Sequence, residues 1–374
     1  MTASAHSLSA HAVRPLVYDP AFERAEDDEA ETAQELVDTM LQISRKVQAD
    51  EGHAFRSVHA KGHGILRAQL QVLDGLPAAY AQGVFAQPRT YPVVMRFSTP
   101  PGDLLDDRVS TPRAVALKLV GVQGPRVPGA QGQATQDFLM ANGPAFSAPT
   151  GKKFLANLKL LAATTDRADG AKRVLSAALR GVESLVEKVG GESATLKAMG
   201  GHPLTHILGE SFFTQVPLLY GPYMAKLSLV PVSPELVALT DRKLDMDDRP
   251  DALREAVVAH FRTHGGRWDL RVQLCVDLEA MPIEDASVPW PEERSPYVTV
   301  AHLSAGPQDA WSDARVAAVN DGMSFSPWHA LQAHRPLGSV MRLRQAAYEA
   351  AARFRGSSNA TPVREPEQLD DFPD

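Results

Sequence analysis

Residues 55–72, FRSVHAKGHGILRAQLQV, begin with a short polar segment and end in a run where apolar and polar residues alternate. Alternation with a period of two predicts a half-buried β-strand. Further short apolar runs, such as YPVVMRF at 91–97, follow as far as Leu119 and are bounded by Gly and Pro. Short runs punctuated in this way are typical of antiparallel sheet.

Helical patterns flank and interrupt this strand-rich region. Apolar residues at helical spacing predict helices over 32–47, 152–197 and 251–264, and the segment 338–355, which has no internal Gly or Pro, predicts a last one. Strand patterns return at 211–219, 223–232, 270–281 and 298–305. Because strands lie on both sides of a helical insertion, we predict one sheet completed by distant segments, and one integrated domain rather than two.

The composition is that of a globular protein, with 44% hydrophobic and 22% charged residues in a chain of 374. Asp and Glu (45) outnumber Lys and Arg (38), which gives a net charge of -7, and no basic tract stands out. Nucleic acid is therefore not an expected partner, because phosphate binding depends on concentrated positive charge.

The single cysteine, Cys275, excludes an intrachain disulfide and a cysteine-rich zinc site, and fits a reducing compartment. Its position in an alternating strand pattern predicts a buried packing residue. No apolar run reaches the roughly 18 residues that cross a bilayer, and the N-terminus lacks an export-signal pattern. We expect a cytoplasmic protein without stable membrane insertion.

Two stretches near opposite ends of the chain carry residues suited to chemistry. His59 follows the apolar Val58 at the mouth of the first predicted strand, although an isolated histidine is more often structural than catalytic. In the last predicted helix, Arg344 lies four residues before Tyr348, and Arg355 lies seven after it, so all three share a helix face.

The helix pattern is suggestive because a nearby guanidinium favours an ionised phenol, and tyrosine is one of the axial ligands of haem iron. On the helix alone, a surface position in which the arginines merely extend into solvent is the better explanation of the pattern.

Six collinear stretches resemble the haem catalases. They are RSVHAKGHG at 56–64, RFST at 96–99, PRAVALK at 112–118, DFL at 137–139 with NGPAF at 142–146, WPE at 290–292, and RQAAY at 344–348 with Arg355. The run at 326–355 looks most like the shorter, catalase-related haem peroxidases. The resemblance implies an α+β fold, an antiparallel eight-stranded β-barrel with inserted and C-terminal helices. It divides the chain into an N-terminal arm and helix (1–54), a haem-binding core (55–356) and a flexible tail (357–374).

By the same resemblance, a b-type haem lies between the barrel and the last helix, with Tyr348 as the iron ligand and Arg344 as its charge partner. His59 is the expected proton shuttle, and Ser98 is expected to orient it by a hydrogen bond. The residues expected to line the cofactor further are Arg56, Arg96 and Arg355 at the haem propionates and Val58 and Phe146 as walls of the distal pocket.

The sequence departs from the catalase pattern at the distal amide. Alignment on Pro144 and Phe146 places Ala141 where an asparagine is expected, with Asn142 one position later. Either Asn142 acts as the catalytic amide through a shifted backbone, or the site lacks that donor. Because the sequence ends soon after the last predicted helix, we expect it to lack the helical C-terminal domain of full-length catalases, and we do not assume nucleotide binding.

These features predict a haem peroxidase that reduces hydrogen peroxide or organic hydroperoxides through a ferryl intermediate, with weak or no catalase activity. The expected partners are a peroxide, a small organic reductant and, as in related proteins, further copies of the chain in a homo-oligomer. One alternative is a hydroperoxide isomerase or lyase similar to the allene oxide synthases, where Thr commonly precedes the distal histidine in place of Val58. The other is a haem carrier without turnover.

Overall fold

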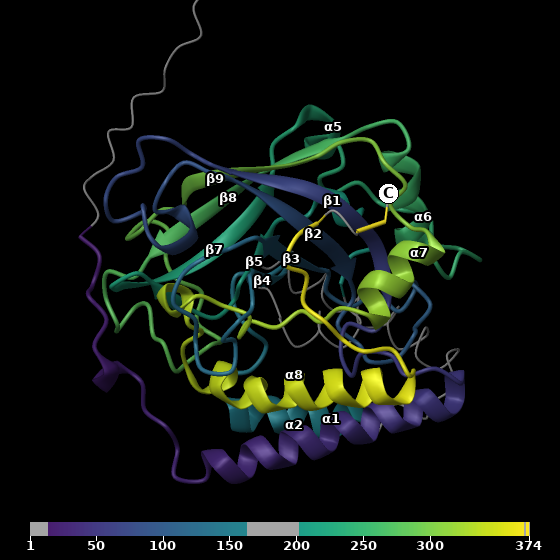
Figure 1. The fold of residues 1–374 in the computed structure, drawn as a ribbon, viewed down its shortest axis with the longest axis horizontal. Coiled ribbons are helices and arrows are strands. Elements are labelled where there is room, and N and C mark those ends of the chain that lie inside the picture. Colours follow the sequence, from purple (N-terminus) through teal and green to yellow (C-terminus); the bar gives the residue numbers. More distant parts are fainter. Residues whose placement is uncertain (1–13, 163–201, 370–371, 374) are drawn as a thin grey trace, which may run out of the picture.

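Eight antiparallel strands close into a β-barrel in the computed structural model, which describes residues 14–162, 202–369 and 372–373 (Figure 1). The barrel strands are β1 (Gly62–Val72), β2 (Thr90–Ser98), β3 (Ala114–Val120), β4 (Thr135–Ala141), β5 (Phe212–Phe213), β7 (Tyr223–Pro231), β8 (Gly266–Leu274) and β9 (Val298–Ala305). Strand β5 pairs with both β4 and β7, and β1 pairs with β9, so the sheet has no open edge there. Strand β6 (Leu218–Tyr220) pairs with β7 outside the closed ring. The predicted barrel is thereby confirmed.

Helices connect and cover the strands. The described helices are α1 (Glu29–Glu51), α2 (Gly151–Ala162), α5 (Pro234–Val237), α6 (Ala252–Phe261), α7 (Asp313–Val316) and α8 (Ser339–Ser358). Short 3₁₀ turns lie at η1 (Pro20–Phe22), η2 (Gly83–Phe85), η3 (Ile207–Gly209) and η5 (Gln332–His334), and η4 (Ala317–Asp321) is a π-helical turn. Of the helix predicted over 152–197, the part after residue 162 lies outside the described residues.

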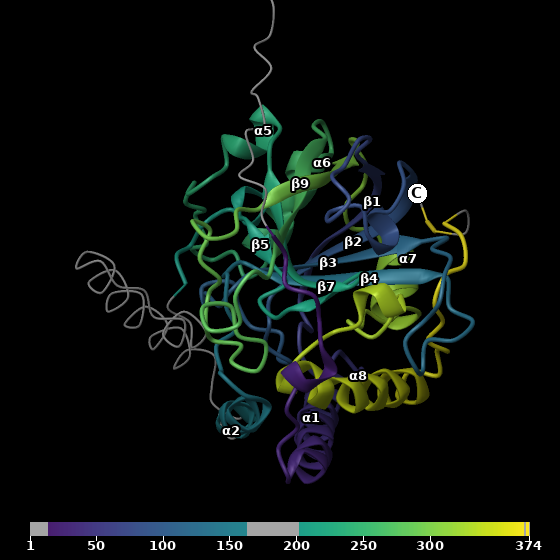
Figure 2. The same cartoon turned by 90° about the vertical axis from the view of Figure 1, so that its left-hand side faces the viewer.

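Helices α1, α2 and α8 form a layer on one side of the barrel, as Figures 1 and 2 both show. The layer is held by a buried apolar cluster to which Leu36 of α1, Leu155 of α2 and Leu343 of α8 contribute. Helix α1 is longer than the predicted 32–47 because both of its ends are polar. It ends at Glu51, and the following Gly52 takes the left-handed conformation (φ 71°) common after a helix C-terminus. The apolar cluster fixes α8 against α1 and α2.

The barrel interior is packed with side chains. Along β2, Val93, Met95 and Phe97 belong to the main apolar cluster inside the barrel, together with Trp268 and Phe212 from the opposite wall. Because successive strand residues point to opposite faces, the intervening β2 residues point outward, toward the helix layer. Arg96 and Ser98, the β2 residues expected at the functional site, are therefore on the outside of the barrel.

The chain returns to this outer face after α8. The segment following Ser358 runs back between α8 and the strands in Figure 1, with Glu365 paired to Lys118 of β3. The Arg67 side chain of β1 donates a hydrogen bond to the Leu369 carbonyl (2.7 Å), and Phe372 packs with Ile65 and Val94. The described tail residues thus form part of the cover over β1–β3.

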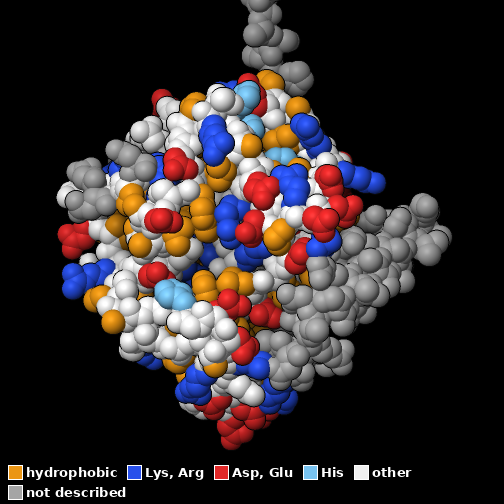
Figure 3. All heavy atoms as spheres, turned by 90° about the vertical axis from the view of Figure 1, so that its right-hand side faces the viewer, with side chains coloured by type: hydrophobic (Ala, Val, Ile, Leu, Met, Phe, Trp, Pro, Cys, Tyr) orange, Lys and Arg blue, Asp and Glu red, His pale blue; other side chains and the backbone are white. Residues whose placement is uncertain are grey.

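Charges on the molecular surface are mixed. On the face seen in Figure 3, Lys and Arg side chains are interspersed with Asp and Glu. In the part of the chain that the structure describes, no helix is long and apolar enough to cross a membrane. Cys275 is buried in a small apolar cluster just past the end of β8, which agrees with its predicted packing role, and burial raises the pKa of its thiol to about 11.

Candidate active site

His59 lies in the loop that leads into β1. Its backbone takes the left-handed conformation (φ 56°), which is uncommon for a residue with a side chain, and its N–H donates to the Pro100 carbonyl (2.7 Å). The loop approaches its neighbour closely, since a Cβ on Gly102 would lie 2.1 Å from the Ser57 carbonyl oxygen. The tight packing of these two loops holds His59 in a strained conformation, as is frequent at functional sites.

The His59 side chain is oriented and kept neutral. Its Nδ1 is 3.2 Å from the hydroxyl oxygen of Ser98, the last residue of β2. Burial, together with the positive charges of Arg96, Arg344 and Arg56, lowers the pKa of His59 to about 3. A neutral imidazole at ordinary pH can accept a proton, which is the property that a general base requires.

Arg344 and Tyr348 face each other on α8. The Arg344 guanidinium donates a hydrogen bond to the Tyr348 hydroxyl oxygen and lies 5.0 Å from the centre of its ring. A second guanidinium nitrogen is 3.7 Å from the Met341 sulfur. The one-face arrangement expected from their spacing is present, and it places a positive charge directly beside the phenol oxygen.

The two stretches meet in space although almost 300 residues separate them. Val58 packs against the apolar cluster that contains Leu343 and Ala347, the neighbours of Arg344 and Tyr348 on α8. The influence of Arg344 on the pKa of His59 places its charge within electrostatic range of the imidazole. An imidazole on the barrel side therefore lies near an arginine-backed phenol on the helix side.

Three arginines gather beside this site. Arg56 comes from the His59 loop, Arg96 from β2 and Arg355 from α8, and the side chains of Arg96 and Arg355 are 2% and 3% exposed. Burial lowers the pKa of Arg96 to about 9 and that of Arg355 to about 10, and burial together with the charges of Arg355 and Arg96 lowers the pKa of Arg56.

Their hydrogen-bond partners are neutral oxygens. Arg56 donates to the carbonyls of Val319, Asn320 and Met323, at 2.8, 2.8 and 2.9 Å. Arg96 donates to the Asn320 side-chain oxygen (2.9 Å) and the Ala60 carbonyl (3.1 Å), and Arg355 donates to the Met323 carbonyl (2.8 Å).

The arginine cluster fits an anionic group. The Nε atom of Arg355 is buried and has no hydrogen-bond partner within the described ranges, and a buried guanidinium nitrogen in that state is costly. Guanidinium groups bind carboxylates with paired, charge-assisted hydrogen bonds. A cofactor that carries two carboxylates, such as haem, suits this arrangement of donors, and the phenol of Tyr348 suits its iron.

Phe146 lies next to the first turn of α8 in space. Its ring packs against Val340 and Met341 and meets the Phe154 ring edge-on, with 5.2 Å between centroids. Met341 in turn contacts Arg344. Phe146 and Val58 thus border the α8 segment that bears Arg344 from two sides.

Asn142 makes its side-chain hydrogen bonds with described residues other than His59 and Ser98. Its side-chain oxygen accepts from the Arg113 N–H (2.8 Å), and its nitrogen contacts His202 (2.6 Å) and Glu210 (3.2 Å). Asn142 comes directly after β4, and along the strand it continues the series of every second residue to which Phe138 and Met140 belong. Phe138 and Met140 point into the barrel. Alternation gives Ala141, not Asn142, the outward orientation that Ser98 has on β2.

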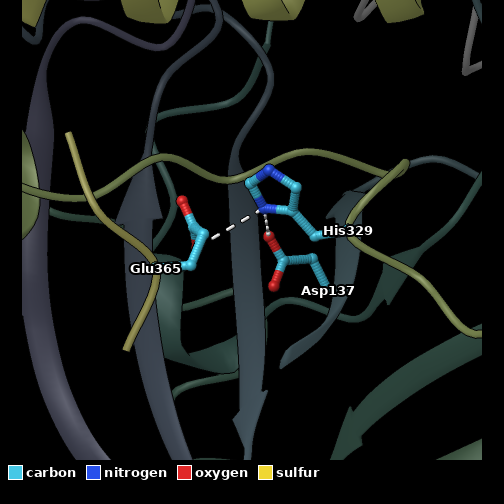
Figure 4. Close-up of side chains that lie close together, drawn as sticks. All are labelled: Asp137, His329 and Glu365. Atoms are coloured by element: carbon cyan, nitrogen blue, oxygen red, sulfur yellow. Dashed lines mark hydrogen bonds and ion pairs between the residues drawn. The ribbon is translucent and has the colours of Figure 1, made fainter. Parts of the chain in front are cut away.

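A charged cluster lies on the same outer face. Asp137, His329 and Glu365 converge from β4, the segment before η5 and the tail (Figure 4), with His329 Nδ1 3.0 Å from Asp137 and 3.4 Å from Glu365. Their spacing could hold a metal ion. However, the ammonium of the fully buried Lys118 lies 2.7 Å from Asp137 and 2.5 Å from Glu365. The cluster therefore already contains its cation. Burial alone would lower the pKa of Lys118, but the two carboxylates raise it.

The sequence indicated the three arginines but not the acceptors that hold them. The Val319, Asn320 and Met323 oxygens lie in a stretch that matches none of the quoted motifs. The only local signal was the dipeptide Asp321-Gly322, which indicates a turn. Glu365, in the predicted flexible tail, gave no signal at all.

The fold defined by this barrel and helix layer is the catalase-like fold. No family model matches the sequence, and no curated protein matches it. Solved structures do match. A fungal catalase has a TM-score of 0.57 at 16% identity, a bacterial catalase 0.56 at 16%, and catalase A from Saccharomyces cerevisiae 0.57 at 15%.

The similarity covers 88% of this chain in each case, and 70%, 64% and 70% of those catalases respectively. At such identities the likeness shows the fold. The catalase resemblance predicted from the sequence is thereby confirmed for the architecture, and the subtype of shorter peroxidase remains a prediction.

Proposed function

We propose that the chain is a haem-dependent peroxidase that reduces hydrogen peroxide or organic hydroperoxides. The observation that carries the proposal is the pairing of a neutral, serine-oriented His59 on the barrel face with an arginine-backed Tyr348 on the facing helix. The buried arginine cluster with an unpartnered Arg355 nitrogen supports haem b as the cofactor.

Tyr348 would ligate the iron, and Arg56, Arg96 and Arg355 would hold the propionates. A bound ferric haem supplies a redox-active iron at which a peroxide O–O bond can be cleaved. The protein's part is proton transfer and orientation. Because Nδ1 of His59 is engaged by Ser98, we assign to Nε2 the removal of the peroxide proton and its return to the departing oxygen. Arg344 holds positive charge at the Tyr348 oxygen throughout, which stabilises an anionic ligand.

Ala141 favours the peroxidase branch over rapid dismutation. Dismutation requires a second peroxide to be oriented as a reductant, and a methyl group at the outward position of β4 supplies no hydrogen bond for this purpose. Asn142, the neighbouring amide, makes its hydrogen bonds to Arg113, His202 and Glu210. Turnover would therefore rely on an organic electron donor.

The test begins with the optical spectrum of the purified protein titrated with hemin. We expect a high-spin ferric spectrum of the tyrosinate type, which the Tyr348→Phe variant loses and the control Tyr297→Phe retains. Tyr297 is a suitable control because its ring packs against Phe213 on another part of the barrel. Protein that takes up no hemin would contradict the proposal.

Turnover assays separate the alternatives. The peroxidase proposal predicts oxidation of an added phenolic donor by peroxide, with oxygen evolution far below that of a catalase. Oxygen evolution at a catalase-like rate would contradict it. Rearrangement of a fatty-acid hydroperoxide without a donor would identify an isomerase, and unchanged peroxide kinetics in His59→Ala would identify a carrier.

A further inference from the structure

One short turn holds all three arginines of the proposed cofactor site. Residues 319–323, here named the 319–323 turn, comprise the last three residues of the π-helical segment η4 (Ala317–Asp321) and the two residues after it. Every acceptor in the turn is neutral: the carbonyls of Val319, Asn320 and Met323, and the side-chain oxygen of Asn320. The turn thus connects residues from the His59 loop, β2 and α8.

The local backbone explains why these carbonyls are available. The Gly322 N–H bonds to the Ala317 carbonyl, five residues earlier, which is the π-helical pattern. Carbonyls at a helix C-terminus have no partner within the helix, and the negative end of the helix dipole favours cations there. Single π-helical turns occur frequently at functional sites. Val319, Asn320 and Met323 therefore present partial negative charge to the arginines without neutralising them.

Asn320 is the only residue of the turn whose side chain binds one of these arginines within the described chain. Its Oδ1 accepts from Arg96 Nε (2.9 Å) while its carbonyl accepts from Arg56 (2.8 Å). The adjacent Asp321 directs its carboxylate away, to His53 (2.9 Å) and Asn359 (3.3 Å). An aspartate at 320 would have the shape to accept from Arg96 but would add a full negative charge at the centre of the cluster.

We propose that Asn320 is a positioning residue for the anionic cofactor, and that its neutrality keeps the arginine cluster positive enough to bind two carboxylates. The inference rests on the proposed function. Asn320 fixes the directions of Arg56 and Arg96 and adds no negative charge to that of Asp321 and Glu365, which act on Arg56 from farther away, so positive charge remains for the ligand to compensate. Without the ligand, the mutual repulsion of these buried cations destabilises the protein.

The test compares Asn320→Asp, Asn320→Leu and wild-type apoprotein. We expect Asn320→Asp to raise the melting temperature of the apoprotein, because it compensates buried positive charge, and to weaken hemin binding about tenfold or more. Asn320→Leu removes the acceptor without adding charge and should lower both the melting temperature and the hemin affinity. A role in shape alone would predict little change in Asn320→Asp.

Two controls assign the effect to charge. Hemin dimethyl ester lacks the free carboxylates, so wild type and Asn320→Asp should bind it equally. Asp321→Asn alters the same turn but removes a negative charge, and should leave hemin affinity unchanged or increase it. If wild type binds hemin and Asn320→Asp binds it with equal affinity, the inference alone is overturned. The same holds if wild type binds hemin and the Asn320→Asp apoprotein has a lower melting temperature than wild type. Wild type that binds no hemin would overturn the proposed function, and the inference with it.

Discussion

The two faces of strand β2 differ in character although they alternate along one nine-residue segment. Val93, Met95 and Phe97 point into a barrel interior filled with apolar side chains. Arg96 and Ser98 point outward, to the arginine cluster and to His59. The inner face buries apolar surface and needs no ligand to be stable, whereas the outer face holds cations and an oriented imidazole.

This difference shows which face of β2 stabilises the folded state and which face lowers its stability. Apolar packing stabilises without directional requirements, but buried charges are stable only when paired or hydrogen-bonded. Substitutions on the inner face should therefore change folding, and those on the outer face should change peroxide chemistry.

The largest expected effect is on the outer side. Replacing His59 with Ala should lower the rate constant for reaction with peroxide by about 10²–10⁴-fold, because the general base is lost. Hemin binding should remain, since the arginine contacts are elsewhere. Stopped-flow absorbance measures the rate, and His302→Ala, at an exposed position on β9, is the matched control. A His59→Ala rate within a factor of two of wild type would contradict the assignment.

Phe97→Ala should show the opposite behaviour. Removing this fully buried ring leaves a cavity beside Phe212 and Trp268, and should lower the free energy of unfolding by about 3–5 kcal/mol. The hemin spectrum of the folded variant should match that of wild type. Urea unfolding provides the measurement, and a loss below about 1 kcal/mol would show that the interior is not close-packed there.

Because of the buried His334, we expect the stability of the protein to depend on pH. Its Nε2 accepts from the Val84 N–H (3.0 Å), and burial lowers its pKa to about 4. The unfolded histidine takes up a proton near pH 6.5 and the folded one does not, so stability is lost as the pH falls from about 6.5 toward 4. At pH 5 this single group accounts for about 2 kcal/mol. His334→Gln should therefore lose less stability than wild type between pH 7 and pH 5, and equal losses would exclude the assignment.

The smallest expected effect concerns Ser98. Its hydroxyl contributes one hydrogen bond to His59, and such a bond is worth about 1 kcal/mol, so Ser98→Ala should slow the peroxide reaction about fivefold. The free energy of unfolding should fall by no more than about 1 kcal/mol. Ser228→Ala, a buried serine on β7, is the control and should leave the rate unaffected. Equal slowing in both variants would indicate a general effect on the barrel.

Alternation and punctuation are local signals and predicted the antiparallel strands, whereas the closed barrel was predicted through the catalase resemblance. The joint site of His59, Ser98 and Tyr348 was predictable only through the catalase resemblance, since no local pattern links residues so far apart. Asn142 illustrates a limit, because one position along β4 decides which face a side chain takes, and the motif alone did not determine it. Asn320 and Glu365 could not be predicted, since their contacts are with residues distant in the chain.

The path of the segment after α8 bears on the order of events during synthesis. Strand β1 is among the first parts of the barrel to be synthesised, yet its Arg67 donates a hydrogen bond to the Leu369 carbonyl. Likewise, Lys118 of β3 forms an ion pair with Glu365. The outer wall of the barrel therefore stays exposed on the nascent chain until residues 365–372 emerge.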